Sequence, residues 1–177
     1  MKKLLLGGIL LSMFFLVVVC GNLDVTSSPT PTAQPTQPQP TPKPKSLKQQ
    51  LDTIVQNTDH RDQNAHTALV GTSFSVTEDF NQLSLLSNND LVEDFKQDCY
   101  NLQRAIWTNR VSERLTQVEV IFTLDTQDKY GKVYPHTKVG SCTLTHKTAA
   151  LFHWDNLIAD DTWNLYDSTF LIPFLTS

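Results

Sequence analysis

The fold is decided by the stretch Val118–Leu124, which reads VEVIFTL. Every second residue of this stretch is apolar and most residues between them are polar, and this alternation predicts a β-strand with one buried face. Turn-forming residues follow at 125–132, where Gly131 suits a left-handed backbone conformation. A further strand is expected over 138–146, so we interpret the region as a β-hairpin with a long tip.

Two amphipathic helices are expected before this hairpin. Ser46 followed by Gln49 forms a capping-box pattern that opens a short helix. A longer helix starts at Ser87 or Asp90, and apolar residues then recur every three or four positions as far as Trp107. One side of this helix is apolar and the other polar, which predicts a helix that covers a sheet.

The remaining elements complete a small α+β domain. Alternating residues near 68–76 predict one strand, a short helical segment begins at Thr148, and a last helix runs from about Asp160 to Pro173. The order is helix, strand, long helix, strand, strand, helix, helix. It favours a single small α+β domain with an antiparallel three-stranded sheet and helices packed on one face.

Composition excludes several classes of protein. The chain has 177 residues, of which 40% are apolar, and three cysteines, which excludes a collagen, a dense disulfide scaffold and a polytopic membrane protein. The segment 46–177 carries 10 basic and 17 acidic residues, a formal charge of −7. Such an acidic surface repels phosphate backbones, so we expect no nucleic-acid partner.

The first 21 residues have the organisation of an export signal. Lys2 and Lys3 precede an uninterrupted, mostly apolar run over 4–19. The sequence over 17–21, VVVCG, resembles the lipobox of bacterial lipoproteins, although valine stands where those proteins usually carry a small residue. The resemblance implies lipidation of Cys20. An uncleaved signal anchor, or ordinary cleavage with release, remains open as an alternative.

Residues 22–45 form a spacer between the leader and the domain. Seven of the nine prolines fall within 27–45, interleaved with Thr, Gln and Lys. Such a segment lacks the apolar side chains needed to form a core, and it favours an extended chain of about 3.1 Å per residue. We therefore expect a disordered Thr/Pro-rich stalk and a globular domain at 46–177.

This organisation resembles uncharacterised exported, membrane-tethered proteins of Gram-positive and filamentous soil bacteria. In the folded part, the run 138–145 followed by 152–157 is similar to uncharacterised domains of such lipoproteins. The resemblance implies a location at the outer face of the cytoplasmic membrane or in the cell envelope. It implies no activity and no functional residue.

Cys99 and Cys142 are predicted to form a disulfide. Cys99 falls on the apolar face of the long helix and Cys142 on a strand. An exported domain meets an oxidising environment in which such a pair is stable. Two free thiols in the core are the alternative.

No motif in the sequence identifies catalytic, cofactor-binding or metal-binding residues. Asp59, His60, Asp62 and His66 lie close together in the sequence, but their spacing matches no established zinc motif. Aromatic residues near the hairpin tip, where burial is hard to arrange, are the preferred candidates for a binding surface. These residues are Tyr130 and Tyr134.

The function expected from the sequence is therefore a tethered binding or accessory module without enzymatic activity. Its partner would be an envelope protein or a cell-wall component, and no cofactor is expected. The alternative is a secreted hydrolase that uses paired carboxylates. The acids considered for that role are Glu78, Asp79, Glu119, Asp125 and Asp128.

Overall fold

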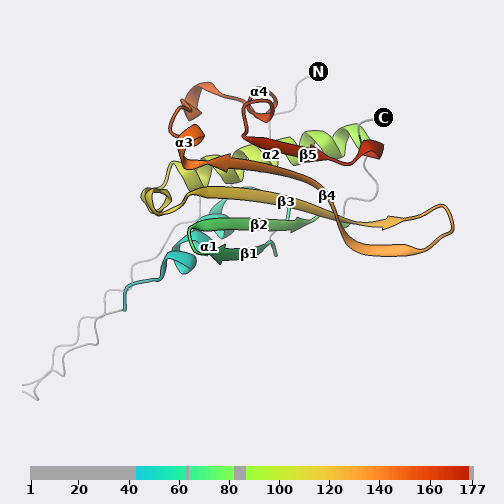
Figure 1. Ribbon diagram of the computed structural model, residues 1–177, viewed down its shortest axis with the longest axis horizontal. Helices are drawn as coiled ribbons and strands as arrows, with labels where there is room; N and C mark the ends of the chain where they lie inside the picture. The colour runs from blue at the N-terminus through green and yellow to red at the C-terminus, as the bar shows by residue number, and fades with distance from the viewer. Residues whose placement is uncertain (1–42, 63, 82–86, 176–177) are drawn as a thin grey trace, which may run out of the picture. The chain divides into compact units, whose positions relative to one another are not determined.

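A computed structural model describes residues 43–62, 64–81 and 87–175 (Figure 1). The first 42 residues, with the leader, Cys20 and most of the spacer, lie outside the described part of the chain. The elements are α1 (Leu47–Asn57), β1 (His66–Val70), β2 (Ser73–Asp79), α2 (Asn88–Trp107), η2 (Arg110–Arg114), β3 (Gln117–Gln127), β4 (Val133–Thr145), α3 (His146–Ala149), η3 (Trp154–Asn156), α4 (Ala159–Trp163), β5 (Ser168–Leu171) and η4 (Pro173–Leu175).

The strands of this part of the chain form one mixed sheet in the order β1-β2-β3-β4-β5. Neighbouring strands are antiparallel except β2 and β3, which run parallel. Parallel neighbours require a long crossover, and α2 supplies it. The α+β class is confirmed, whereas the prediction of a three-stranded, wholly antiparallel sheet is wrong.

One of the missed strands comes from a hairpin near residue 71. The sequence predicted one strand near 68–76, but β1 and β2 are separated by a tight turn in which Gly71 has a φ of +60°. The turn brings Val70 opposite Ser73. Val70 therefore lies on the outer face of the sheet, 77% exposed, while Phe74 is buried.

The second missed strand is β5, which the sequence predicted as part of a helix from Asp160 to Pro173. The helix α4 ends at Trp163, and residues 168–171 pair with the edge of β4. An unpaired strand edge presents backbone donors and acceptors, and the extended segment satisfies them. Phe170 consequently lies on an exposed strand, 42% accessible, instead of on a helix.

The core lies between one face of the sheet and α2, which runs behind the sheet in Figure 1. Ser87 caps α2 through a capping box with Asp90, which confirms the predicted start. Phe95 from α2 stacks on Phe122 of β3, with ring centroids 4.6 Å apart. α1 packs beside α2 with Leu51 and Val55 buried.

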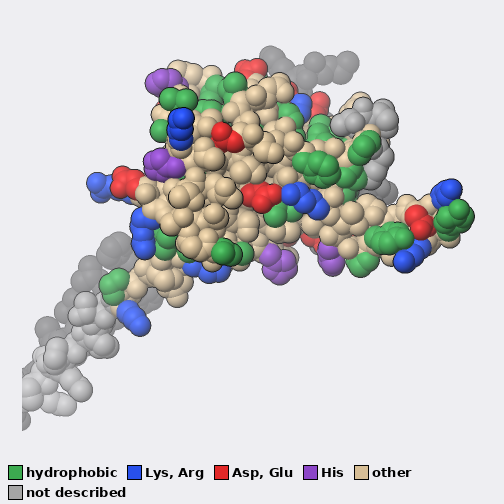
Figure 2. All heavy atoms as spheres, in the orientation of Figure 1, with side chains coloured by type: hydrophobic (Ala, Val, Ile, Leu, Met, Phe, Trp, Pro, Cys, Tyr) green, Lys and Arg blue, Asp and Glu red, His purple; other side chains and the backbone are tan. Residues whose placement is uncertain are grey.

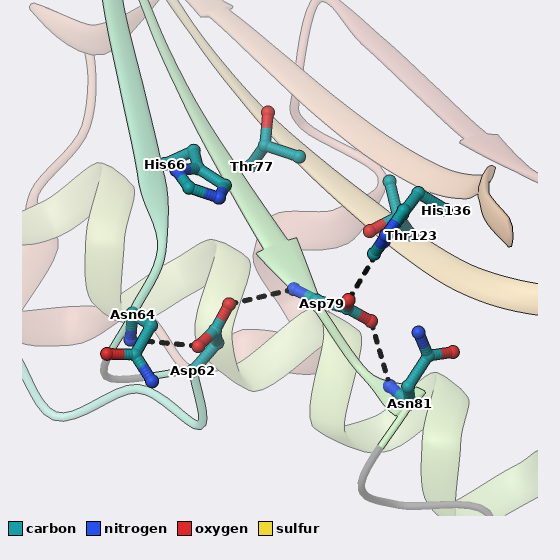
Figure 3. A pocket seen from close by; sticks show the side chains of 8 residues that line it. All are labelled: Asp62, Asn64, His66, Thr77, Asp79, Asn81, Thr123 and His136. Atoms are coloured by element: carbon teal, nitrogen blue, oxygen red, sulfur yellow. Dashed lines mark hydrogen bonds and ion pairs between the residues drawn. The ribbon is translucent and has the colours of Figure 1, made fainter.

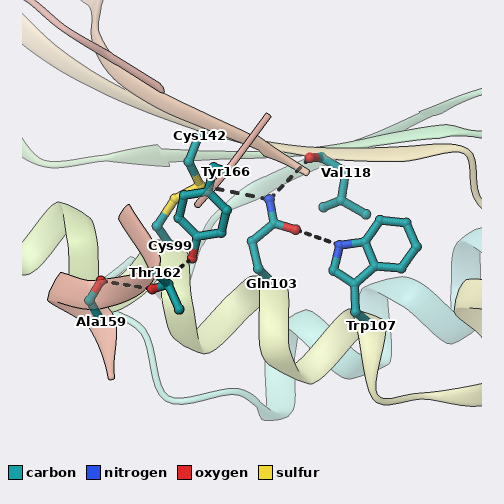
Figure 4. The surroundings of a disulfide bond; sticks show 8 residues. All are labelled: Cys99, Gln103, Trp107, Val118, Cys142, Ala159, Thr162 and Tyr166. Carbon is teal, nitrogen blue, oxygen red and sulfur yellow. Dashed lines mark hydrogen bonds between the residues drawn. A yellow bond between two sulfur atoms is a disulfide. The ribbon is translucent and has the colours of Figure 1, made fainter. Parts of the chain in front are cut away.

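The predicted bridge between Cys99 and Cys142 is present and fastens α2 to the middle of β4 (Figure 4). The two Cα atoms are 6.5 Å apart and both residues are fully buried. Beside the bridge, the fully buried Gln103 donates to the Val118 carbonyl at 3.1 Å and accepts from the Trp107 indole at 2.8 Å. The polar groups near the disulfide are therefore paired, as burial requires.

The hairpin of β3 and β4 is longer than expected, and its end projects beyond the other strands (Figure 1). We call residues 125–137 the arm. A hydrogen bond from the Asp128 N–H to the Lys132 carbonyl, 3.0 Å long, closes its tip. Gly131 adopts a φ of +85° there, the left-handed conformation expected from the sequence.

Candidate functional site

Within the described residues, no helix covers the outer face of the sheet, which is rich in hydroxyl and amide side chains. Figure 2 shows this face, on which neither hydrophobic nor charged side chains predominate. In its middle, the Lys138 ammonium contacts the Glu119 carboxylate at 2.8 Å. Strand register places the following residues on this face: Ser73, Ser75, Thr77, Gln117, Glu119, Thr143 and Ser168.

A polar pocket of about 380 Å³ opens at the end of this face, where β1, β2, β3 and the arm meet (Figure 3). Two aspartates, two asparagines, two histidines and two threonines line it. They come from the loop before β1, from three strands, from the residues that follow β2 and from the arm. The lining residues are Asp62, Asn64, His66, Thr77, Asp79, Asn81, Thr123 and His136.

Two carboxylates of the pocket are held by hydrogen bonds to the backbone. Asp62 accepts from the Asp79 N–H at 2.9 Å and from the Asn64 N–H at 2.8 Å. Asp79 in turn accepts from the Asn81 N–H at 3.0 Å and contacts His136 Nδ1 at 2.9 Å. These contacts fix the direction of both carboxylates before any ligand binds.

The arm is attached to the pocket by Asp125. Its carboxylate accepts from the His136 N–H and from the Asn81 amide, both at 2.9 Å. These two donors lower the pKa of Asp125. His136 has a φ of +50°, a conformation that is uncommon for residues other than glycine, and this turn directs its ring to Asp79.

A second polar cluster lies beneath the sheet, in the core. His60 Nδ1 contacts Glu78 Oε1 at 2.5 Å, and His60 Nε2 donates to the Val55 carbonyl at 3.1 Å. Asp98 of α2 lies beside them and accepts from the Arg61 N–H at 3.1 Å. His60, Glu78 and Asp98 are 5%, 0% and 3% exposed, so three ionisable groups share a site that excludes most water.

Burial changes the proton affinity of all three groups of this cluster. It raises the pKa of Glu78, and together with the charge of Glu78 it raises the pKa of Asp98 to about 7. Burial alone would lower the pKa of His60, but the contact with Glu78 outweighs it and that pKa is raised. Asp98 is therefore still partly protonated at neutral pH, where an exposed aspartate would have lost its proton.

The outer side of this cluster borders a second cavity, of about 400 Å³. Asp98 and His60 reach its wall, together with Asp59, Arg61, Gln97 and Asn101. Outside the cavity, the Arg61 guanidinium pairs with Asp94. This cavity therefore reaches the edge of the buried cluster.

Tyr130 and Tyr134, the binding residues expected from the sequence, are exposed on the arm, 83% and 41%, and do not line either cavity. Lys129 lies over the ring of Tyr130, and Lys132 over that of Tyr134, at 5.0 Å and 4.7 Å from the centroids. The Tyr134 hydroxyl donates to Asp128 at 3.3 Å. Their role in binding stays a prediction.

The histidines and acids that lie close together over residues 59–66 of the sequence separate in the structure. His60 points into the core, whereas Asp62 and His66 line the pocket. Within the described ranges, no group of three or more His, Cys, Asp or Glu side chains is arranged to hold a metal ion. In the same part of the chain, no helix has both the length and the apolarity needed to cross a bilayer.

Of the acids considered for a hydrolase, Glu78 is the one that lies beside another buried carboxylate, Asp98. Asp79 lies on the opposite face of β2, and Glu119 is paired with Lys138. Asp98 was not among the acids considered from the sequence. The strand pattern contained a signal for Glu78, since it follows Phe74 and Val76 at the same spacing of two residues.

Comparison with known proteins gives no further assignment: no family model, curated protein or solved structure matches the chain.

Proposed function

We propose that the chain is an exported binding or accessory module, tethered at the outer face of the cytoplasmic membrane and carrying its ligand site in the polar pocket. The charged and apolar leader, Cys20 and the proline-rich spacer support export and tethering. The buried disulfide supports an oxidising compartment. A lipid on Cys20 or an uncleaved anchor would attach the chain to the membrane.

The observation that carries the proposal is the hydrogen-bonded network that fixes the pocket. Asp62, Asp79 and His136 come from a loop, a strand and the arm, and each is held by another member of the network or by backbone N–H groups. A site whose polar groups are already oriented loses less entropy when a ligand binds. Such preorganisation distinguishes this pocket from an ordinary hollow on a polar surface.

The lining chemistry fits a ligand rich in hydroxyl and amide groups. His66 and Thr77 line the pocket, and Figure 3 draws no hydrogen bond between either of them and the other lining residues, so we propose both as contacts for a ligand. Carboxylates accept hydrogen bonds, and amides and hydroxyls both donate and accept them. The sugar and peptide units of a cell-wall polymer offer this mixture, and we propose that the partner is such a wall component.

The test is co-sedimentation of the full chain, in detergent, with purified insoluble peptidoglycan. We expect His66→Ala to weaken binding about tenfold, the effect of one lost hydrogen bond of about 1.4 kcal/mol. His66 takes no part in the network of Figure 3, so the fold should survive the change. The control is Glu93→Gln, an exposed carboxylate of α2.

A wild-type chain that stays in the supernatant would contradict the proposed partner. Equal binding by wild type and His66→Ala would contradict the proposed pocket. Glu93→Gln removes one exposed negative charge and should bind like wild type. Stronger binding by this variant would show that general charge repulsion affects the measurement.

A hydrolase that uses paired carboxylates is the second candidate, favoured by the buried neighbours Glu78 and Asp98. Asp98, with its pKa raised to about 7, has the proton affinity of a general acid and borders a cavity. The same incubation distinguishes the two functions. A hydrolase releases soluble fragments from the polymer and loses this activity in Asp98→Asn, whereas a binding module releases none.

A further inference from the structure

Three successive residues, which we call the anchor segment (residues 60–62), connect the buried cluster to the pocket. The His60 ring contacts Glu78, and the Arg61 N–H donates to Asp98. The Asp62 N–H lies against the Glu78 carboxylate and stabilises its charge, although neither Glu78 oxygen accepts a well-formed hydrogen bond within the described residues. Two carboxylates beneath the sheet thus determine where the anchor segment lies.

The same segment forms one wall of the pocket. The side chain of Asp62 lines the pocket and accepts from the Asp79 N–H at 2.9 Å (Figure 3). Asp79 in turn holds His136 of the arm. A displacement of the anchor segment would therefore break the hydrogen bond from the Asp79 N–H to the Asp62 carboxylate.

The net charge of the buried cluster depends on one proton. With His60 charged, Glu78 ionised and Asp98 neutral, the three groups carry no net charge. Ionisation of Asp98 places a second negative charge beside Glu78 in a site that is at most 5% exposed. The Arg61 N–H favours the ionised form, but burial and the charge of Glu78 outweigh it. An uncompensated buried charge is costly, and hydration relieves that cost.

The anchor segment covers the side of this cluster that faces the second cavity, and Asp98 reaches the cavity wall at its edge. Arg61 and His60 line the cavity on its outer side, next to Asp98. The other surroundings of the cluster are apolar core and the regular elements β2 and α2. Movement of the anchor segment would therefore widen the opening between this cavity and an ionised Asp98, which is 3% exposed.

We propose that the proton on Asp98 controls the pocket: the anchor segment is held in place while Asp98 is neutral, and it detaches and releases Asp79 when Asp98 ionises. This inference rests on the proposed function, because it concerns regulation of the same binding site.

The charged groups around Asp98 come from three directions. Glu78 faces it from β2, and His60 and Arg61 from the anchor segment. One turn earlier on α2, Asp94 is paired with the Arg61 guanidinium. From α1, the contact with the cluster is the uncharged Val55 carbonyl. Of these groups, Asp98 is the carboxyl whose pKa is raised to about 7, so the transition should centre near neutral pH.

The experiment follows three backbone amides by NMR between pH 5 and pH 9 on the isotope-labelled full chain in detergent. The amides are those of Arg61, Asp62 and Asp79. We expect all three resonances to shift together with a midpoint near pH 7. In Asp98→Asn, which keeps an oxygen to accept from Arg61 but cannot ionise, the shared transition should disappear.

Two further variants determine whether the signal travels along the proposed route. Asp62→Asn weakens the bond to Asp79, so Arg61 should still titrate while the Asp79 amide stops following it. Asp155→Asn removes a carboxylate that is 91% exposed and paired with Arg104 of α2. It should leave the transition unchanged.

The proposal is overturned if the Arg61 and Asp62 amides do not shift over this range, if their transition persists in Asp98→Asn, or if Asp79 fails to follow them in the wild type. None of these measurements needs a ligand. A failure to bind peptidoglycan therefore overturns the proposed function and leaves the titration to be judged separately.

Discussion

Asp98 shows how one buried carboxyl couples the stability of the fold to pH. Burial and the neighbouring Glu78 raise its pKa from 3.8 to about 7. Between about pH 4 and about pH 7, the folded chain therefore still holds a proton that the unfolded chain has already lost. Stability falls with pH wherever the folded state binds more protons, so the Asp98 contribution decreases from about pH 4 to about pH 7.

We expect Asp98→Asn to remove this decrease. Near pH 4 the wild type and the variant should unfold at similar urea concentrations, because both carry a neutral group. Above pH 7 the variant should be more stable by a few kcal/mol, at about 1.4 kcal/mol per pKa unit. Urea denaturation of both proteins at pH 4, 6 and 8 measures this difference. A stability difference that stays constant over this range would show that Asp98 ionises normally in the fold.

Among single residues, the sequence predicted the cysteine pair but not the buried cluster of His60, Glu78 and Asp98. Cys99 and Cys142 could be paired because each fell on a recognisable apolar face. His60 lies in a polar stretch that resembles an ordinary loop, and its burial depends on contacts with β2 and α2. Glu78 did continue the inward pattern of Phe74 and Val76, but a carboxylate at such a position is rarely buried without a partner. Its partners come from segments far along the chain.

Among the elements, the turn between β1 and β2 depends on one residue. Gly71 has a φ of +60°, and an added Cβ would meet no atom within 4 Å. The restriction at this position is therefore one of backbone conformation alone. A residue with a Cβ loses about 1–2 kcal/mol in the left-handed region, and asparagine tolerates that region better than most residues.

We expect Gly71→Ala to lower the free energy of unfolding by about 1 kcal/mol. Gly71→Asn is the matched variant and should lose less, because its side chain is also exposed but it accepts a positive φ. Thermal and urea unfolding of the two variants provide the measurement. Equal stabilities for Gly71→Ala and the wild type would contradict the left-handed turn.

Local signals determined how well each element was predicted. The caps at Ser46 and Ser87 and the regular apolar spacing located both α1 and α2, since these features act within a few residues. The strand β5 was missed because its pairing with β4 is a long-range contact, and an aromatic segment such as 163–170 fits a helix equally well. The β1–β2 hairpin was missed because its two strands share one uninterrupted alternation across the turn.

For the whole molecule, the disulfide connects the compartment to the fold. It closes a loop with a sequence separation of 43 residues, and the loss of chain entropy in the unfolded state corresponds to a stabilisation of about 4 kcal/mol. An exported domain would contain this bridge in its native state. A thiol pair kept in the reducing cytosol would not.

We therefore expect Cys99 and Cys142 in protein taken directly from cells to resist alkylation until a reductant is added. Peptide-level mass spectrometry after acid quenching measures this protection. Reduction should also lower the midpoint of urea unfolding, and the double variant Cys99→Ala with Cys142→Ala should no longer respond to the reductant. Labelling of both thiols without reductant would contradict the bridge and, with it, the support for export.

The disulfide also determines how the domain would carry a mechanical load. Tension that enters at α1 and leaves near β5 would pass from residue 99 to residue 142 through the sulfur atoms instead of along the intervening backbone. The segment between the two cysteines contains the end of α2, the whole of β3 and the arm. Because the disulfide closes this segment into a loop, stretching the chain cannot extend it. Thr123 and His136, which line the polar pocket, belong to that protected segment.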